Sequence, residues 1–153
     1  ARGDFEAAVR DYDEVIELAN RLPEGWERQG ALALAYAYRG VCRVELGDPA
    51  GLEDCEKGVA VAPDYADPYL FRAMALVRLD RWDDGERDLV RAVECEGAWL
   101  TPEQRKQILQ IWRSGNYALL KLFLVQFQEK VPKDMQEQVR FLTRVIDRHL
   151  EKK

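Results

Sequence analysis

Residues 70–95 read LFRAMALVRLDRWDDGERDLVRAVEC, and this stretch decides the fold. On both sides of Asp80, small and apolar residues recur at steps of three and four, which is the spacing of amphipathic helices. Trp82 follows Asp80 by two residues. An aspartate or glycine two residues before an aromatic residue predicts a tight turn. The stretch therefore predicts two antiparallel helices joined by a short turn.

The same pattern occurs three more times along the chain. The matching segments are GDFEAAVRDYDEVIEL from residue 3, YRGVCRVELGDPAGLEDCEKGVAVAP ending at residue 63, and KQILQIWRSGNYALLKLFLVQFQEKVP ending at residue 132. The turn residues Gly3, Gly47, Asp80 and Gly115 are 44, 33 and 35 residues apart. A period of about 34 residues indicates stacked helical hairpins, because one hairpin cannot bury its apolar face alone.

The repeated positions hold a consistent set of small, large and turn residues. They are Tyr36, Gly40, Gly47, Asp48, Gly51, Cys55, Gly58 and Pro63 in the first full repeat, Tyr69, Ala73, Trp82, Gly85, Leu89 and Ala92 in the second, and Gly115, Asn116, Tyr117, Leu120, Leu124, Phe127 and Pro132 in the last. Together they resemble the tetratricopeptide repeat (TPR) family. The resemblance implies an all-α protein, a right-handed helical solenoid of antiparallel helix hairpins with about three and a half repeats and a C-terminal capping helix.

The repeats predict a single domain over residues 1–153, and we expect a fragment of a longer protein because the chain opens in the middle of a repeat. Its parts are expected to be a half repeat at 3–20, repeats at 33–63 and 66–97, a divergent repeat at 101–132 and a capping helix at 134–152. Helices are predicted over residues 4–20, 26–46, 50–62, 66–79, 82–96, 102–114, 117–131 and 134–151.

Composition and charge limit the classes of function. The chain is 47% hydrophobic and 33% charged, which is typical of a globular protein, and no apolar run reaches the roughly 18 residues of a membrane span. We therefore expect a cytoplasmic protein. Residues 1–100 hold 12 Lys and Arg against 22 Asp and Glu, whereas residues 101–153 hold 11 against 6. The acidic body argues against nucleic acid, and the basic end favours an acidic partner or the acidic end of a second copy.

Neither catalysis nor cofactor binding is predicted. Cys42, Cys55 and Cys95 are widely spaced and form no CxxC pair, so no metal site is expected and the thiols are interpreted as reduced, apolar side chains. His149 is expected to be solvated on the charged face of the last helix. The glycines stand singly instead of forming a phosphate-binding loop. We therefore interpret the chain as a protein without enzymatic activity.

By the resemblance, the first helix of each hairpin lines a concave groove. The residues expected there are Leu34, Tyr38, Val41, Leu70, Phe71, Met74, Val77, Arg78, Arg105, Leu109, Trp112 and Arg113. Such a groove is apolar and aromatic with arginines toward one end, which suits a peptide or amphipathic helix that carries apolar anchors and acidic residues. The sequence thus predicts a protein–protein interaction scaffold.

Two other functions stay open. The predicted helix at 117–131 has almost no polar face, since it holds Leu119, Leu120, Leu122, Phe123, Leu124, Val125 and Phe127. It is expected either to be buried between its neighbouring helices or to contact a partner or a second copy. One alternative is therefore a self-assembly module that forms a homo-oligomer. The other is a regulatory arm of a larger multidomain enzyme.

Overall fold

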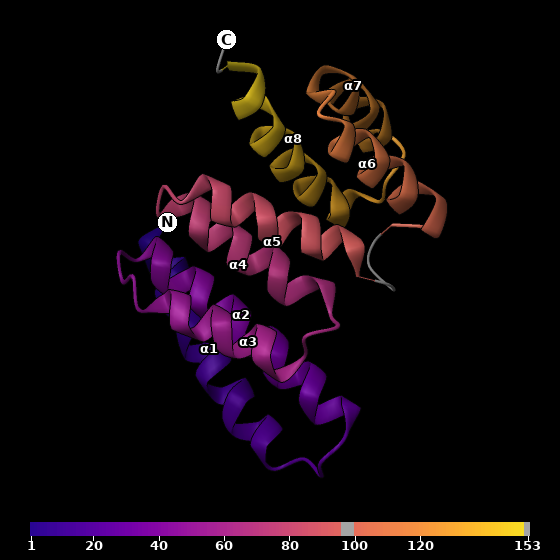
Figure 1. The fold of residues 1–153 in the computed structure, drawn as a ribbon. Helices are drawn as coiled ribbons and strands as arrows, with labels where there is room; N and C mark the ends of the chain where they lie inside the picture. The colour runs from indigo at the N-terminus through magenta and orange to yellow at the C-terminus, as the bar shows by residue number, and fades with distance from the viewer. Residues whose placement is uncertain (96–99, 152–153) are drawn as a thin grey trace. The chain divides into compact units, whose positions relative to one another are not determined.

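The structure is a computed structural model and describes residues 1–95 and 100–151. These residues form eight α-helices (Figure 1). They are α1 (Arg2–Asn20), α2 (Trp26–Glu45), α3 (Gly51–Val61), α4 (Ala66–Arg78), α5 (Trp82–Glu94), α6 (Pro102–Ser114), α7 (Tyr117–Gln128) and α8 (Gln136–Glu151), with a 3-10 helix, η1 (Lys133–Met135), before α8. All eight predicted helices are confirmed to within three residues at each end. The predicted boundaries at residues 96, 97 and 152 lie outside the described residues.

The chain divides into two compact units, residues 1–96 and 97–153. In the first unit α2 packs against α1, α3 and α4, and α4 also packs against α3 and α5. In the second unit α7 packs against α6 and α8. The protein is therefore all-α, with its helices packed in adjacent pairs. The predicted right-handed solenoid and the predicted single domain both depend on how the two units are joined. Both stay predictions.

Three hairpin turns contain a residue in the left-handed backbone region. Gly47 ends the α2 segment at φ 87°, Asp80 follows α4 at φ 63°, and Gly115 follows α6 at φ 77°. Glycine adopts this region without a steric penalty, and aspartate is one of the few other residues that tolerate it. The Asp80 carboxylate also accepts a hydrogen bond from the indole N–H of Trp82 at 2.9 Å. These three residues were predicted as turns, and the prediction is confirmed. Gly3 was predicted as a turn as well, but it lies in the first turn of α1, so that prediction was wrong.

Small residues allow α2 and α3 to approach each other closely. Gly40 of α2 faces Gly51 of α3, and a methyl group on Gly40 would lie 2.8 Å from the backbone nitrogen of Cys55. Farther along the same pair of helices, a methyl group on Gly58 would lie 2.8 Å from the carbonyl oxygen of Ala33. No side chain larger than hydrogen fits either position without movement of the backbone.

A polar cluster ties α2 to α3, and we call it the first brace. Asp54 is nearly buried, with its side chain 4% exposed, and it accepts two hydrogen bonds from Arg39, each 2.9 Å long. Arg43 donates a third hydrogen bond to Asp54 at 2.7 Å. The guanidinium of Arg39 and the ammonium of Lys57 lie within 6 Å of the Tyr36 ring, at 5.4 and 5.7 Å from its centroid. A buried carboxylate with paired, charge-assisted donors fixes the helices in one register.

The same cluster recurs in the next hairpin as the second brace. Arg72 of α4 donates two hydrogen bonds to Asp88 of α5, at 2.6 and 2.7 Å. Arg72 and Arg91 lie 5.8 and 5.7 Å from the centroid of the Tyr69 ring. These four residues follow their counterparts in the first brace by 33 or 34 residues. The repeat therefore extends to a polar network that the apolar pattern did not predict.

The α2–α3 contact also buries a thiol. Cys55 is fully buried, and its Sγ lies 3.6 Å from the carbonyl oxygen of Ala37. Burial raises the pKa of this thiol from its usual 9.0 to about 12. Desolvation disfavours the charged thiolate, so the folded protein holds the thiol proton more tightly than the unfolded chain does.

We expect Cys55 to lower stability as the pH rises. Its pKa is higher in the folded state, so its contribution is complete below pH 9 and is lost between pH 9 and about 12. The slope reaches at most about 1.4 kcal/mol per pH unit. Urea unfolding of the wild type and of Cys55→Ala from pH 8 to 11 measures this effect. The difference between their free energies of unfolding should shrink as the pH rises. A difference that stays constant over this range would contradict the assigned shift.

The second unit is held together by the apolar stripe of α8. Val139, Leu142 and Ile146 are fully buried, and Leu120 and Leu124 of α7 are buried with them. His149, expected to be solvated, is instead half-buried with its ring stacked 3.9 Å from that of Tyr117. The expectation was wrong because α7 supplies an aromatic ring beside α8. In the described part of the chain, no helix combines the length and apolarity that crossing a membrane requires.

Candidate functional site

A series of aromatic rings crosses three helices of the first unit. Tyr12 of α1 stacks on Tyr38 of α2, with ring centroids 5.3 Å apart and planes 7° apart. Tyr38 in turn contacts Phe71 of α4, with centroids 4.0 Å apart. Aromatic pairs at these separations attract each other beyond their apolar burial. The series makes a continuous aromatic strip from α1 to α4.

Met74 extends this strip along α4. Asp67, Phe71, Met74 and Arg78 follow one another at steps of four, three and four, so they lie along one side of the helix. Phe71 is mostly buried, whereas Met74 is 37% exposed, so the edge of the strip is accessible to a partner. We call Tyr12, Tyr38, Phe71 and Met74 the aromatic face.

Charged groups stand at both ends of the aromatic face. At one end, partial desolvation raises the pKa of Asp67. Burial, and then the charges of Asp67 and Tyr12, raise the pKa of Tyr38 as well. At the other end, Arg78 of α4 pairs with Glu45 of α2, with Nε 3.2 Å from the carboxylate. An apolar centre between an acid and an ion pair can hold an apolar side chain and orient the backbone around it.

The structure separates the twelve predicted groove residues by burial. Tyr38, Met74, Arg78 and Arg113 are exposed, Leu34, Val41 and Arg105 are half-buried, and Leu70, Phe71, Val77, Leu109 and Trp112 are buried. On α4, Leu70 and Val77 are almost fully buried, whereas Met74, which lies between them along the helix, is 37% exposed. Arg105, Leu109, Trp112 and Arg113 belong to the second unit, so a groove shared by both units stays a prediction.

Three residues of this region were not in the predicted set. Tyr12 lies on α1, outside the helices that the resemblance assigns to the groove. Glu45 and Asp67 were not predicted, although Asp67 stands four residues before Phe71 and Glu45 four after Val41. Helical spacing from the predicted residues would have found both of them.

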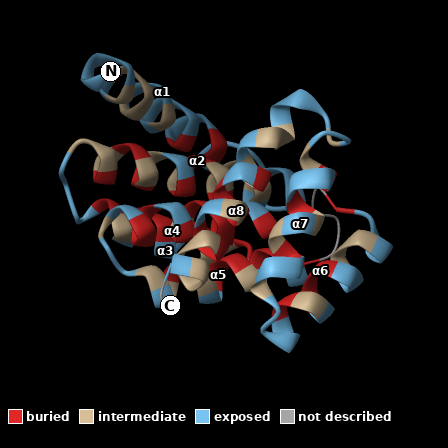
Figure 2. Cartoon of the chain, turned by 90° about the horizontal axis from the view of Figure 1, so that it is seen from above, coloured by how far each residue is buried: buried red, intermediate tan, exposed pale blue. Residues whose placement is uncertain are grey.

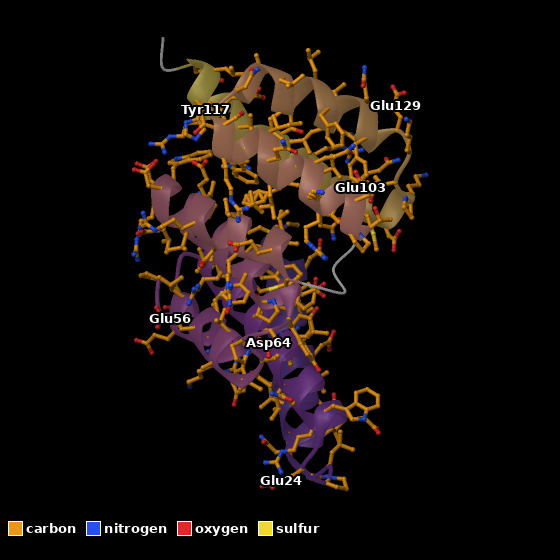
Figure 3. The ribbon with its side chains drawn as sticks, turned by 45° about the vertical axis from the view of Figure 1, so that its right-hand side comes forward. Glu24, Glu56, Asp64, Glu103, Tyr117 and Glu129 are labelled. Atoms are coloured by element: carbon orange, nitrogen blue, oxygen red, sulfur yellow. The ribbon has the colours of Figure 1, made fainter. Side chains whose placement is uncertain are left out.

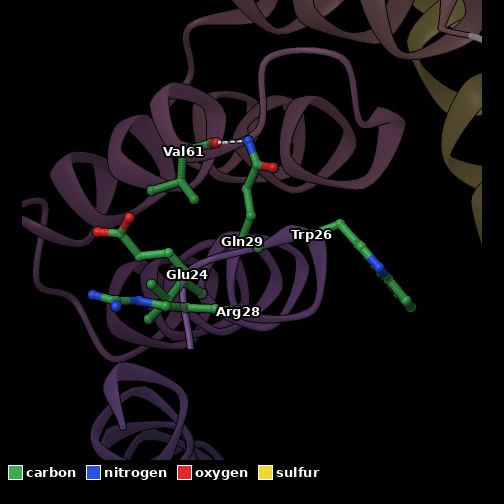
Figure 4. A pocket seen from close by; sticks show the side chains of 7 residues that line it. Glu24, Trp26, Arg28, Gln29 and Val61 are labelled. Atoms are coloured by element: carbon green, nitrogen blue, oxygen red, sulfur yellow. Dashed lines mark hydrogen bonds between the residues drawn. The ribbon is translucent and has the colours of Figure 1, made fainter. Parts of the chain in front are cut away.

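A separate hollow, a surface pocket, lies beside the loop that joins α1 and α2. It has a volume of 430 Å³ and is lined by Glu24, Gly25, Trp26, Arg28, Gln29, Leu32 and Val61. Glu24 lies in the loop that joins the two helices (Figure 3). The amide of Gln29 donates a 2.7 Å hydrogen bond to the carbonyl of Val61 (Figure 4). No prediction covered this hollow. Across residues 1–95 and 100–151, no three His, Cys, Asp or Glu side chains gather as metal ligands would.

Comparison with known proteins gives a distant similarity. The chain is 27% identical over 95 residues to sperm-associated antigen 1 of Rattus norvegicus. The matched residues are 61% of this chain and 10% of that protein, so the chain spans only a small part of its relative. No family model matches the chain, and no solved structure does. The chain is therefore an all-helical protein with distant homology to a TPR-containing protein.

Proposed function

We propose that this chain is a non-catalytic protein–protein interaction module that binds a peptide or amphipathic helix along α2 and α4. The observation that carries the proposal is the aromatic face, where Tyr38 and Met74 stay exposed on tightly packed helices. Aromatic side chains and methionine are enriched at protein interfaces, where rigid apolar anchors contribute most of the binding energy. The distant relationship to a TPR-containing protein supports the same role.

The partner's chemistry follows from the two ends of the face. Its centre needs one or two apolar side chains that contact Tyr38 and Met74. Arg78 is exposed beside Glu45, so an acidic residue of the partner can replace Glu45 in this ion pair. We therefore propose a short segment with apolar anchors and an acidic residue at the Arg78 end.

The test is selection of peptides from a displayed random library against the immobilised chain. For selected peptides, we expect Met74→Glu to weaken binding at least about tenfold, because a charge in an apolar contact must be desolvated. Trp26→Glu is the control, since Trp26 is 74% exposed but lies outside the aromatic face. Circular dichroism checks that both variants stay folded. Peptides that bind wild type and Met74→Glu equally would place binding elsewhere and contradict the proposal.

A further inference from the structure

One side of α1 carries an exposed apolar stripe. Val15 and Leu18 lie on α1, and Leu22 stands two residues after the end of the helix. The three residues are spaced by three and four, and Leu18 is 52% exposed. Other residues of α1, including the buried Ile16 and Ala19, face the interior where α1 packs against α2. We call the first three residues the α1 stripe. Exposed apolar side chains that adjoin one another favour a contact with another surface.

The α1 stripe lies in acidic surroundings. Asp11 stands one helical turn before Val15, and Glu14 stands one turn before Leu18; both are exposed. Over its length α1 holds six acidic residues and two arginines. Two α1 stripes cannot pair with each other without bringing these carboxylates together, and like charges at an interface weaken binding.

A second stripe lies on α7, in the other unit. Leu119, Leu122 and Val125 are exposed at steps of three, and Leu122 is 61% exposed. Leu120, Leu124 and Phe127 on the other side of α7 are buried, so the helix is covered on one side only, as the mixture of colours on α7 also shows (Figure 2). We call the three exposed residues the α7 stripe. Lys121 is the one charged residue of α7 and pairs with Asp147 at 2.6 Å.

The two stripes belong to parts of the chain that have opposite net charge. Residues 101–153, which include the α7 stripe, hold 11 Lys and Arg against 6 Asp and Glu. The α1 stripe sits in the acidic part of the chain, where residues 1–100 hold 22 Asp and Glu against 12 Lys and Arg. Attraction between these fields orients the approach of two copies, and the leucines and valines then exclude water.

We propose that two copies of this chain associate head to tail, with the α1 stripe of one packed against the α7 stripe of the next. This contact covers both stripes, whereas pairing of two α7 stripes would leave the α1 stripe exposed. A single contact of this kind leaves one α7 stripe and one α1 stripe uncovered in the pair, so a further copy can add at either end. The association uses residues outside the aromatic face and is independent of peptide binding.

The experiment is sedimentation velocity of the whole chain over a wide range of concentration. For the wild type we expect a concentration-dependent series of oligomers. Leu18→Glu disrupts the α1 stripe, and Leu122→Glu disrupts the α7 stripe. Each variant alone is expected to associate at least about tenfold more weakly than the wild type, since a buried unpaired charge weakens an interface. An equimolar mixture of the two variants is expected to form a one-to-one dimer and nothing larger, because one intact stripe of each kind remains.

Met74→Glu is the matched control, since Met74 is 37% exposed but belongs to the aromatic face. It is expected to lose peptide binding and to keep the oligomer series, so the two proposals can fail separately. Leu119→Glu repeats the α7 substitution if Leu122→Glu loses its helical circular dichroism. A wild type that is monomeric at every concentration overturns the proposal. So does a Leu18→Glu variant that dimerises as strongly as the wild type, because that dimer would join two α7 stripes.

Discussion

Alanine at Gly40 is expected to lower the free energy of unfolding by about 3 kcal/mol, because the added methyl group overpacks the crossing of α2 and α3. That methyl group would lie 2.6 Å from the Sγ of Cys55 and 2.8 Å from its backbone nitrogen, and it would also meet the carbonyl oxygen of Gly51. Two of these atoms belong to the backbone and cannot rotate away. The helices must therefore separate, and this weakens the apolar contacts of Cys55 with Val44 and Ala75.

Urea unfolding followed by circular dichroism measures this effect. Gly3→Ala is the matched control, since Gly3 is also helical and a methyl group there meets no atom within 4 Å. We expect this control to raise the free energy of unfolding by up to about 1 kcal/mol, because alanine favours helix over glycine. Equal changes in the free energy of unfolding for Gly40→Ala and Gly3→Ala would contradict the close crossing at Gly40.

Removal of the Asp54 carboxylate is expected to be as damaging. In Asp54→Ala the guanidinium of Arg39, which is 14% exposed, loses both of its hydrogen bonds to that carboxylate. Breaking a buried ion pair on one side costs about 3–5 kcal/mol, because a charge is left partly buried. Arg39 keeps its pair with the exposed Asp13 at 2.9 Å, which places the loss toward the lower end of this range.

A double-mutant cycle separates the pair from the loss of packing. Arg39→Met with Asp54→Ala removes the unpaired charge, so we expect the double variant to be more stable than Asp54→Ala alone. Asp88→Ala in the second brace is the internal comparison, and it should show a similar loss because Asp88 binds Arg72 in the same way. Strictly additive effects of the Arg39 and Asp54 substitutions would contradict a coupled pair.

The sequence was sufficient to predict the helices and, apart from Gly3, the turn residues. Their signals are local: apolar spacing marks each helix, and Gly47, Asp80 and Gly115 stand where the backbone enters the left-handed region. The close approach of α2 and α3 involves Gly40 and Gly58, which are among the small residues at the repeated positions. These features depend on residues adjacent in the chain or one period apart.

The candidate site was only partly predictable. Phe71 and Leu70 are both large and apolar, and only the packed arrangement of α2, α4 and α5 decides how deeply each is buried. Tyr12 joins the aromatic face from α1, a helix that the repeat pattern assigns to another role. The braces were missed for a similar reason. Arg39 and Asp54 are common surface residues, and their burial follows from the helix pair that encloses them.

The braces also constrain how this chain can change in length. Arg39 and Asp54 lie on the two helices of one hairpin, and so do Arg72 and Asp88. Tandem duplication or deletion of a whole period of 33 or 34 residues leaves every arginine with its own aspartate. An insertion or deletion of two residues within α3 rotates Asp54 by about half a turn from Arg39 and leaves both charges unmatched. Evolution of this protein is therefore expected to tolerate the gain or loss of complete hairpins far more readily than small insertions inside a helix.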